Sequence, residues 1–157
     1  MRKSKISISG FKIGTAENRE GLTGVTVILA PDGGATAGVD VRGCAPGTRE
    51  TDLLDPRKTV QKIHAVVLSG GSAFGLEAAS GCVKYLAEQG VGFPIGNVCV
   101  PIVCSAVLFD LMIGDEKAYP DLLMGYEAAK SASSEFLSGC NGCLLYTSPS
   151  PRDRTRS

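Results

Sequence analysis

The chain has 157 residues, 43% of them hydrophobic, which is the size of one domain with enough apolar material for a core. Its 16 basic and 16 acidic side chains balance, so the charge favours neither nucleic acid, nor an anionic membrane, nor an acidic partner. The apolar stretches at 65–68 and 102–109 are too short to span a membrane, and no signal-peptide segment opens the chain. These features predict a cytoplasmic protein.

The N-terminal part of the chain predicts β-structure. Residues 6–13 alternate polar and apolar side chains, with a bulge or turn at Gly10. Residues 24–30 are rich in β-branched side chains and end at the turn sequence Pro-Asp-Gly-Gly of residues 31–34. Residues 35–41 are then expected to return as the second strand of an antiparallel hairpin.

The middle of the chain predicts a strand followed by a helix. A polar loop at 42–52, whose charges could line a cleft but favour solvated surface, leads to a short helical stretch at 55–62. Residues 63–68 form a compact apolar strand, expected to be buried on both faces. The helix after it should run to about Gln89, with its core face spaced as helical periodicity requires. That face comprises Leu76, Ala79, Val83 and Leu86.

The remaining elements complete a layered α/β pattern. Residues 92–103 look strand-like but are broken by proline and glycine, and 105–112 extend the same region. Residues 120–133 predict a second amphipathic helix with Leu123, Tyr126 and Ala129 along one side. The order of hairpin, strand, helix, strand and helix predicts the α/β class.

The strand-to-helix junction Ser69-Gly70-Gly71-Ser72 is the most informative site in the sequence. A helix start offers N–H groups and partial positive charge, and glycine lets a ligand approach, so this junction could bind a carboxylate, an oxyanion or a phosphate. It matches neither a phosphate-binding loop, nor the dinucleotide fingerprint, nor a nucleophile elbow. The residues alone favour the structural alternative, a tight turn with Ser72 as helix cap.

Other reactive side chains give weaker signals. His64, the only histidine, begins an apolar strand and is read as a hydrogen-bonded structural residue rather than the base of a Ser/His/Asp triad. No group of residues has metal-ligand spacing, so we predict neither metal nor cofactor. The six cysteines are read as reduced, mostly buried small hydrophobes: Cys44, Cys82, Cys99, Cys104, Cys140 and Cys143.

The composition changes abruptly at residue 143. Residues 143–157 lack apolar periodicity, and a codon series typical of a transposon-based sequencing adapter would translate to their first part. The structural alternative is a disordered tail. We therefore interpret 143–157 as translated adapter and 1–142 as the front part of a single domain that continues beyond it.

Several segments together resemble the DmpA/NylC family of L-aminopeptidase/D-esterases, β-peptidyl aminopeptidases and nylon-oligomer hydrolases. The resemblance runs from about Gly10 to Gly139, and its most specific block is residues 69–79. The segments that carry it are residues 24–28, 38–43, 45–52, 64–79, 101–103 and 106–111.

This resemblance implies a precursor that cuts itself before a Ser or Thr, whose freed α-amino group then serves as the base of an amidase or aminopeptidase. It implies a four-layer α/β/β/α sandwich, a homo-oligomer and a small peptide or amide as substrate. The nucleophile lies downstream of Gly142 in the family, so this chain should be inactive. The first candidates for the pocket wall are Ser69, Gly70, Gly71 and Ser72. The second candidates are Phe109 and Asp110. Relatives carry a site tyrosine near Phe109.

Two other functions remain open from the sequence. One is acyl transfer by a related self-cleaving fold of the ornithine acetyltransferase type. The other is a non-enzymatic domain that binds a small molecule.

Overall fold

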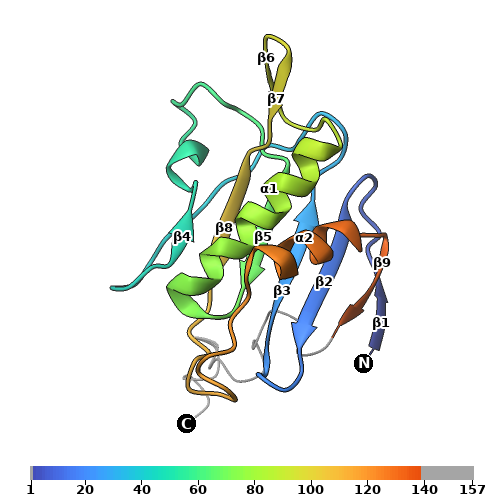
Figure 1. Cartoon of the computed structure of the whole chain (residues 1–157). Coiled ribbons are helices and arrows are strands. Elements are labelled where there is room, and N and C mark those ends of the chain that lie inside the picture. The colour runs from blue at the N-terminus through green and yellow to red at the C-terminus, as the bar shows by residue number, and fades with distance from the viewer. Residues whose placement is uncertain (1, 139–157) are drawn as a thin grey trace.

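A mixed sheet of five strands is the centre of the protein, and the computed structural model describes residues 2–138 (Figure 1). The strands of this sheet are β2 (Lys12–Asn18), β3 (Thr23–Leu29), β4 (Thr48–Arg49), β5 (Ala65–Ser69) and β8 (Val103–Val107). They lie in the order β2-β3-β5-β8-β4. Only β5 and β8 are parallel neighbours, and the chain between them passes through a helix. The predicted α/β class is therefore confirmed.

One face of the sheet carries the core. Strand residues alternate between faces, and the register aligns the buried side chains of neighbouring strands, so Val27 lies beside Val67. The buried apolar side chains on this face are Val25, Val27, Leu29, Ala65, Val67 and Val103. Four of the six are valines, and this β-branched character explains why these segments form strands that pack against helices.

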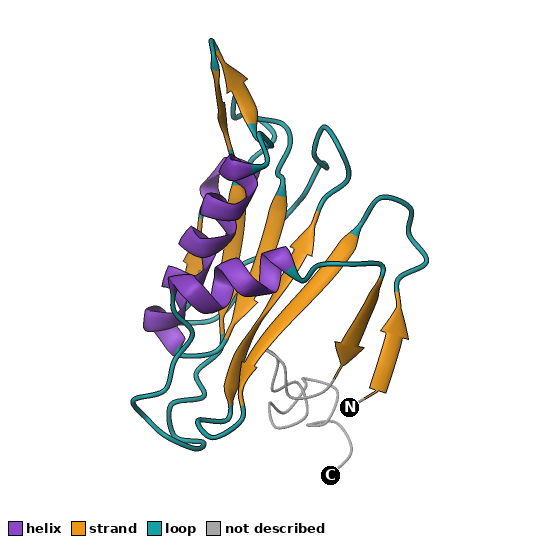
Figure 2. Ribbon diagram, turned by 45° about the vertical axis from the view of Figure 1, so that its right-hand side comes forward, coloured by secondary structure: helices purple, strands orange, loops and turns teal. Residues whose placement is uncertain are grey.

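Two helices cover that face (Figure 2). The chain leaves β5 through a 3₁₀ helix, η2 (Ser72–Glu77), that continues into α1 (Ala78–Glu88), and α2 (Leu122–Lys130) crosses α1. Small residues allow close contact at the crossing: a Cβ on Gly81 would overlap the Leu122 carbonyl, and one on Gly125 would overlap the Ala78 carbonyl. The core of the protein lies between these helices and the sheet.

The opposite face of the sheet carries no helix among residues 2–138. Cys104 is buried on this face, but the other apolar side chains are half-buried, in contrast to the buried side chains of the helix-covered face. The half-buried ones are Ile13, Ile28, Val66, Leu68 and Ala106. We call this surface the open face. Strand 63–68 was predicted to be buried on both faces; this is wrong for Val66 and Leu68, which are half-buried, while His64 on the same side is buried.

Two small sheets flank the central one. β1 (Arg2–Lys5) pairs with β9 (Glu135–Ser138) at one side, and β6 (Phe93–Ile95) pairs with β7 (Val98–Val100) in a hairpin that projects from the other end of the sheet. No helix among the described residues is long and apolar enough to cross a membrane.

Three predicted details are wrong. Residues 35–41 do not form the predicted second strand of a hairpin and contribute only an isolated β-bridge between Ala35 and Ile63. Residues 55–62 form turns, and the nearby helix is the short η1 (Asp52–Leu54). Leu123 was predicted for the core side of α2 but is 63% exposed, because small residues form the core face of this helix.

Candidate functional site

The two segments predicted to form a site meet at one edge of the sheet. Because β5 and β8 are parallel, their carboxyl ends lie side by side, with Ser69 in register with Val107. The Leu108 N–H donates to the Ser69 carbonyl over 2.8 Å, and the Ser72 N–H donates to the Leu108 carbonyl over 2.8 Å. The structure thus brings the 69–72 junction next to Phe109 and Asp110.

The buried side chain of Asp110 stabilises this edge of the sheet through hydrogen bonds. Its side chain is only 4% exposed. One carboxylate oxygen accepts a hydrogen bond from the Thr23 hydroxyl over 2.8 Å. The other accepts a hydrogen bond from the Gly71 N–H over 2.6 Å. A Cβ on Gly70 would overlap both the Asp110 carboxylate and the Thr23 hydroxyl, so only glycine fits there. Asp110 therefore ties the start of β3 to the junction after β5.

The backbone turns sharply as it leaves β5. Gly71 has φ 79°, and Ser72, the first residue of η2, has φ 52°. A left-handed conformation is costly for a residue with a Cβ, so the Ser72 N–H bond to Leu108 and the Asp110 bond to Gly71 hold the turn in place. Ser72 makes no capping bond, and Gly71 occupies the cap position. The alternative reading of Ser72 as a helix cap is therefore wrong.

The N–H groups of this junction are already bonded inside the protein. Gly70 donates to the Gly24 carbonyl over 3.0 Å, while Gly71 and Ser72 donate to Asp110 and Leu108. Ser69 is fully buried, and its hydroxyl donates to the Gly70 carbonyl over 3.0 Å. What this junction offers a ligand is therefore the half-buried Ser72 and the shape of the turn, rather than a row of free N–H groups.

Exposed aromatic side chains lie close to this turn. Phe109, from the loop after β8, is 67% exposed, and Phe74, from η2, is 57% exposed. Phe74 stacks on Tyr119 with ring centroids 4.7 Å apart and planes at 19°. A Cβ on Gly71 would press against Tyr119, which places this ring pair directly beside the turn. We call Ser72, Phe74, Phe109 and Tyr119 the junction surface.

Three residues that make these contacts were not predicted from the sequence as part of the site. Thr23 lies 87 positions before Asp110, and nothing in the local pattern of either residue points to the other. Phe74 lies in the block 69–79 that carries the family resemblance, but it was not singled out as a site residue. Tyr119 precedes Pro120, outside every predicted element. Only the tertiary arrangement brings these residues to the junction.

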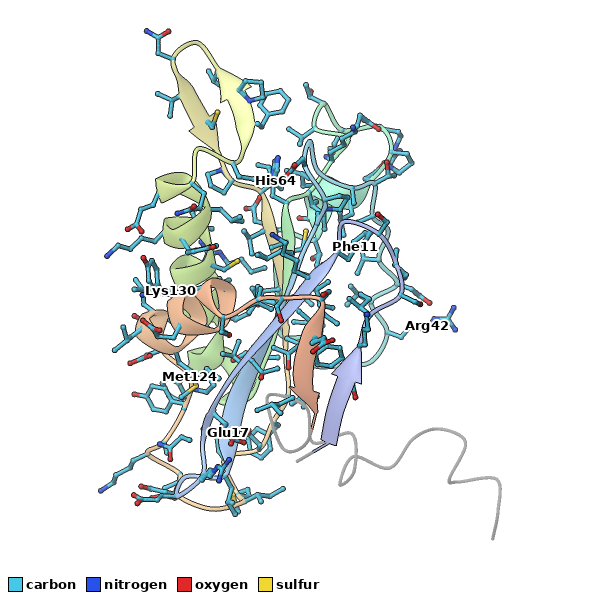
Figure 3. All side chains as sticks on the ribbon, turned by 90° about the vertical axis from the view of Figure 1, so that its right-hand side faces the viewer. Phe11, Glu17, Arg42, His64, Met124 and Lys130 are labelled. Atoms are coloured by element: carbon cyan, nitrogen blue, oxygen red, sulfur yellow. The ribbon has the colours of Figure 1, made fainter. Side chains whose placement is uncertain are left out.

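His64 lies at the other end of β5, directly before its first residue (Figure 3). Its Nδ1 accepts the Ile102 N–H over 3.1 Å, and the side chain is 6% exposed. Burial lowers the pKa of His64, which favours the neutral ring. The reading of His64 as a hydrogen-bonded structural residue is confirmed.

The described cysteines are free thiols. Cys82 and Cys104 are buried, Cys99 is half-buried and Cys44 is exposed. Burial raises the pKa of Cys82 to about 12, so its thiol stays protonated at neutral pH. Cys140 and Cys143 lie outside the described residues. Within residues 2–138, no three His, Cys, Asp or Glu side chains gather closely enough to hold a metal ion.

Sequence comparison decides the family. The sequence model of "Peptidase family S58" matches residues 6–143. The chain belongs to peptidase family S58. It is 47% identical, over 119 residues, to a Mycobacterium tuberculosis (strain H37Rv) protein named "Uncharacterized aminopeptidase", covering 76% of this chain and 34% of the relative. It is 34% identical to the 6-aminohexanoate-oligomer endohydrolase of Agromyces sp. over 154 residues, which is 98% of this chain and 41% of that protein. The resemblance seen in the sequence is thus confirmed.

Solved structures support the same fold. The PH0078 protein of Pyrococcus horikoshii superposes with a TM-score of 0.68 at 21% identity, over 86% of this chain and 42% of that one. An ornithine acetyltransferase of Mycobacterium tuberculosis superposes with a TM-score of 0.50 at 14% identity, over 85% of this chain and 76% of that one. The chain spans 34% of the mycobacterial relative and 41% of the endohydrolase.

Proposed function

We propose that residues 1–142 are the front part of a self-processing aminopeptidase or amidase that cleaves amide or ester bonds of small peptides. The observation that carries this proposal is the S58 match, which extends over almost all the described residues. Relatives named as an aminopeptidase and as an oligomer endohydrolase support amide-bond hydrolysis as the shared chemistry. The parent protein would work in the cytoplasm as a homo-oligomer.

The nucleophile in this proposal is a Ser or Thr that self-cleavage exposes as a new N-terminus. Its α-amino group takes the hydroxyl proton, and the hydroxyl oxygen attacks the substrate carbonyl. The amide or ester bond then breaks, the proton passes to the leaving amine or alcohol, and water hydrolyses the acyl-enzyme ester to release the acid and the free hydroxyl. This chemistry needs no histidine, which agrees with the structural role of His64. The nucleophile would come from sequence beyond residue 142.

The junction surface would supply one wall of the pocket. Asp110 fixes the turn at Gly71, and the turn presents Ser72 and Phe109 at the edge of the sheet. Ser69 and Gly70 support this wall from behind, because both are buried. Phe109 has no hydroxyl, so a donor to the oxyanion would have to come from another residue.

The open face would receive a second sheet from the rest of the parent protein. Half-buried apolar side chains on a sheet face are normally covered by another layer. A second sheet and its helices would complete the expected four-layer α/β/β/α sandwich. The length of the relatives, of which this chain spans 34% to 41%, leaves room for these layers.

Expression of two chains tests the proposal. The 157-residue chain should not hydrolyse amino-acid p-nitroanilides, whereas the uninterrupted reading frame should split into two chains and become active. Replacing the Ser or Thr at the cleavage point with Ala should abolish both processing and turnover. Turnover by the 157-residue chain, or an active but uncleaved parent, would contradict the proposal.

The DNA that encodes residues 143–157 should contain the adapter sequence, and any other codon series would exclude that origin.

Acyl transfer is the second candidate, because the fold also superposes on an ornithine acetyltransferase. An assay of the processed parent with an acyl donor, with and without an amine acceptor, separates the two. Hydrolysis releases free acid without acceptor, while a transferase needs the acceptor for turnover. A parent that lacks an Asn-Ser or Asn-Thr cleavage point would instead favour a non-enzymatic binding domain.

A further inference from the structure

A hollow lies beside the start of β5, at the opposite end of this strand from the junction surface. Its volume is about 370 Å³, within the range of roughly 300–1,000 Å³ that is usual for small-molecule sites. Three separate parts of the chain surround it. Gly33 comes from the turn after β3, Lys62 and His64 from the segment that leads into β5, and Phe93 and Pro94 from β6.

His64 offers one ring nitrogen to the hollow. The residue is 6% exposed, and its Nδ1 accepts the Ile102 N–H over 3.1 Å. A nitrogen that accepts a hydrogen bond carries no proton, so the neutral ring has its proton on Nε2. Nε2 has no hydrogen-bond partner among residues 2–138, and the only sealed side-chain nitrogen or oxygen without a partner in that range is Ser105 Oγ. The Nε2–H group therefore opens into the hollow that His64 lines.

Lys62 supplies a positive charge next to this ring. A Cβ at Gly34 would lie 3.1 Å from Lys62 Cβ and 3.6 Å from His64 Cδ2, so the two side chains flank the same glycine. Lys62 is exposed, and none of the ion pairs within residues 2–138 involves it. The hollow thus has one cation whose charge is not neutralised by a neighbouring carboxylate.

The other walls of the hollow are mostly apolar. Phe93 and Pro94 form one side. Gln61 also lines the hollow, but its Nε2 donates to the Pro56 carbonyl over 3.4 Å and to the Lys58 carbonyl, so this amide group holds the surrounding loop in place. Apolar walls with a few convergent polar groups are typical of sites that bind small organic molecules.

We propose that this hollow binds a small organic carboxylate that carries an apolar group. The Lys62 ammonium and the His64 Nε2–H donate to the carboxylate, and Phe93 and Pro94 cover the apolar group. Both polar groups are donors, so an anion fits them and a cation does not. A single lysine matches a singly charged anion, and the apolar walls favour an organic ligand over inorganic phosphate. This inference does not depend on the proposed enzymatic function, because the hollow and the junction surface lie at opposite ends of β5.

A titration with benzoate tests the proposal on the 157-residue chain. The sequence contains one histidine, so the imidazole signals in a long-range ¹H–¹⁵N spectrum report on His64 alone. At constant neutral pH, the Nε2 signal should shift and saturate, with half-saturation at roughly 1 mM for so small a ligand. Benzamide lacks the charge, and acetate and inorganic phosphate lack the ring, so each should bind at least about 10-fold more weakly. The absence of a saturable shift, or equal binding of any of these three probes, would overturn the proposal.

Two lysine variants separate a specific contact from general attraction by charge. Lys62→Met keeps most of the side-chain stem and should weaken benzoate binding about 10-fold. Lys58→Met is the matched control, because Lys58 is an exposed cation in the same loop that does not line the hollow, and its affinity should equal that of the wild type. His64 remains the reporter in both variants. Equal affinities of the two variants would mean that Lys62 does not bind the carboxylate, contrary to the proposal.

The position of the ligand can be determined without any substitution. Nuclear Overhauser effects between unlabelled benzoate and the ¹³C-labelled chain should connect the benzoate ring protons to Phe93 and Pro94. Contacts found only at the junction surface or on the open face would place benzoate elsewhere and refute the assignment of this hollow as its site.

Discussion

Asp110 is a buried carboxylate held by neutral donors. The Thr23 hydroxyl and the Gly71 N–H supply its hydrogen bonds, and no Lys or Arg among the described residues lies within ion-pair distance of it. Hydrogen bonds to a charged acceptor are stronger than those between neutral groups, so two of them are a substantial link between β3 and the junction. The missing Cβ of Gly70 makes space for both.

Substitution of Gly70 tests this arrangement. Gly70→Ala should lower the free energy of unfolding by about 2 kcal/mol or more, because the added methyl group overlaps the Asp110 carboxylate and the Thr23 hydroxyl. Gly38→Ala is the matched control, because a Cβ at Gly38 meets nothing within 4 Å. Urea denaturation of both variants measures the difference. Equal stabilities would mean that Asp110 is not confined by Gly70.

His64 predicts a pH dependence of stability. Its folded-state pKa lies below the ordinary value of 6.5 because of burial, so protonation favours the unfolded chain. The stabilising contribution is complete above the unfolded-state pKa and is lost as the pH falls below it toward the folded-state pKa. The free energy of unfolding should therefore decrease from pH 7 to pH 5.

The control for this effect is His64→Gln, which cannot titrate. Its free energy of unfolding should be lower at pH 7, where the bond from the Ile102 N–H is altered, but flatter across the same pH range. Urea denaturation at several pH values measures both slopes. A variant with the wild-type slope would assign the pH dependence to other groups.

At the scale of elements, the crossing of α1 and α2 depends on small residues. Gly81 and Gly125 let each helix backbone touch the other, and Ala78 and Ala128 are fully buried beside them. Helical periodicity predicted both helices, but it selected Leu123 for the core face of α2. Hydrophobicity alone does not reveal that a helix packs through its glycines and alanines, since close approach depends on the partner helix.

Gly125→Ala tests the crossing. Alanine has the higher helix propensity, by about 1 kcal/mol, so an exposed position would be stabilised. Here the Cβ overlaps the Ala78 carbonyl, and we expect a net loss of about 2 kcal/mol in the free energy of unfolding. Glu127→Ala, at an exposed position of the same helix, should change it by less than about 0.5 kcal/mol. A stabilised Gly125→Ala variant would show that the helices can separate at no cost.

The wrong hairpin prediction also has an explanation at this scale. The Pro31-Asp32-Gly33-Gly34 turn is present, with the Gly34 N–H donating to the Pro31 carbonyl over 2.9 Å. The strand before it, β3, already pairs with β2 on one side and β5 on the other. No edge of β3 is left for residues 35–41. A turn sequence fixes a local reversal, whereas pairing depends on which strands compete for the same edge.

At the scale of the whole molecule, the layers predict that substitutions on the two faces of the sheet reduce stability by different amounts. Val67 is fully buried under the helices, while its neighbour Leu68 lies half-buried on the open face. Val67→Thr buries a hydroxyl and should cost about 1–3 kcal/mol. Leu68→Thr should cost less than about 1 kcal/mol, because water can still reach the hydroxyl. Thermal unfolding of the two variants compares them, and equal losses would show that the open face is covered.

The sequence by itself determined the class, the strands β3 and β5, both helices and the family, because alternation, helical periodicity and the block around 69–79 are local patterns. It also placed Ser69–Ser72 and Asp110 among the candidates, but without their roles. Only the tertiary structure decided that Asp110 binds Thr23 and Gly71, that the junction N–H groups are occupied, and that Phe74 and Tyr119 stack beside Ser72. These contacts join residues far apart in the chain, and their partners are set by strand order and register, which local patterns do not encode.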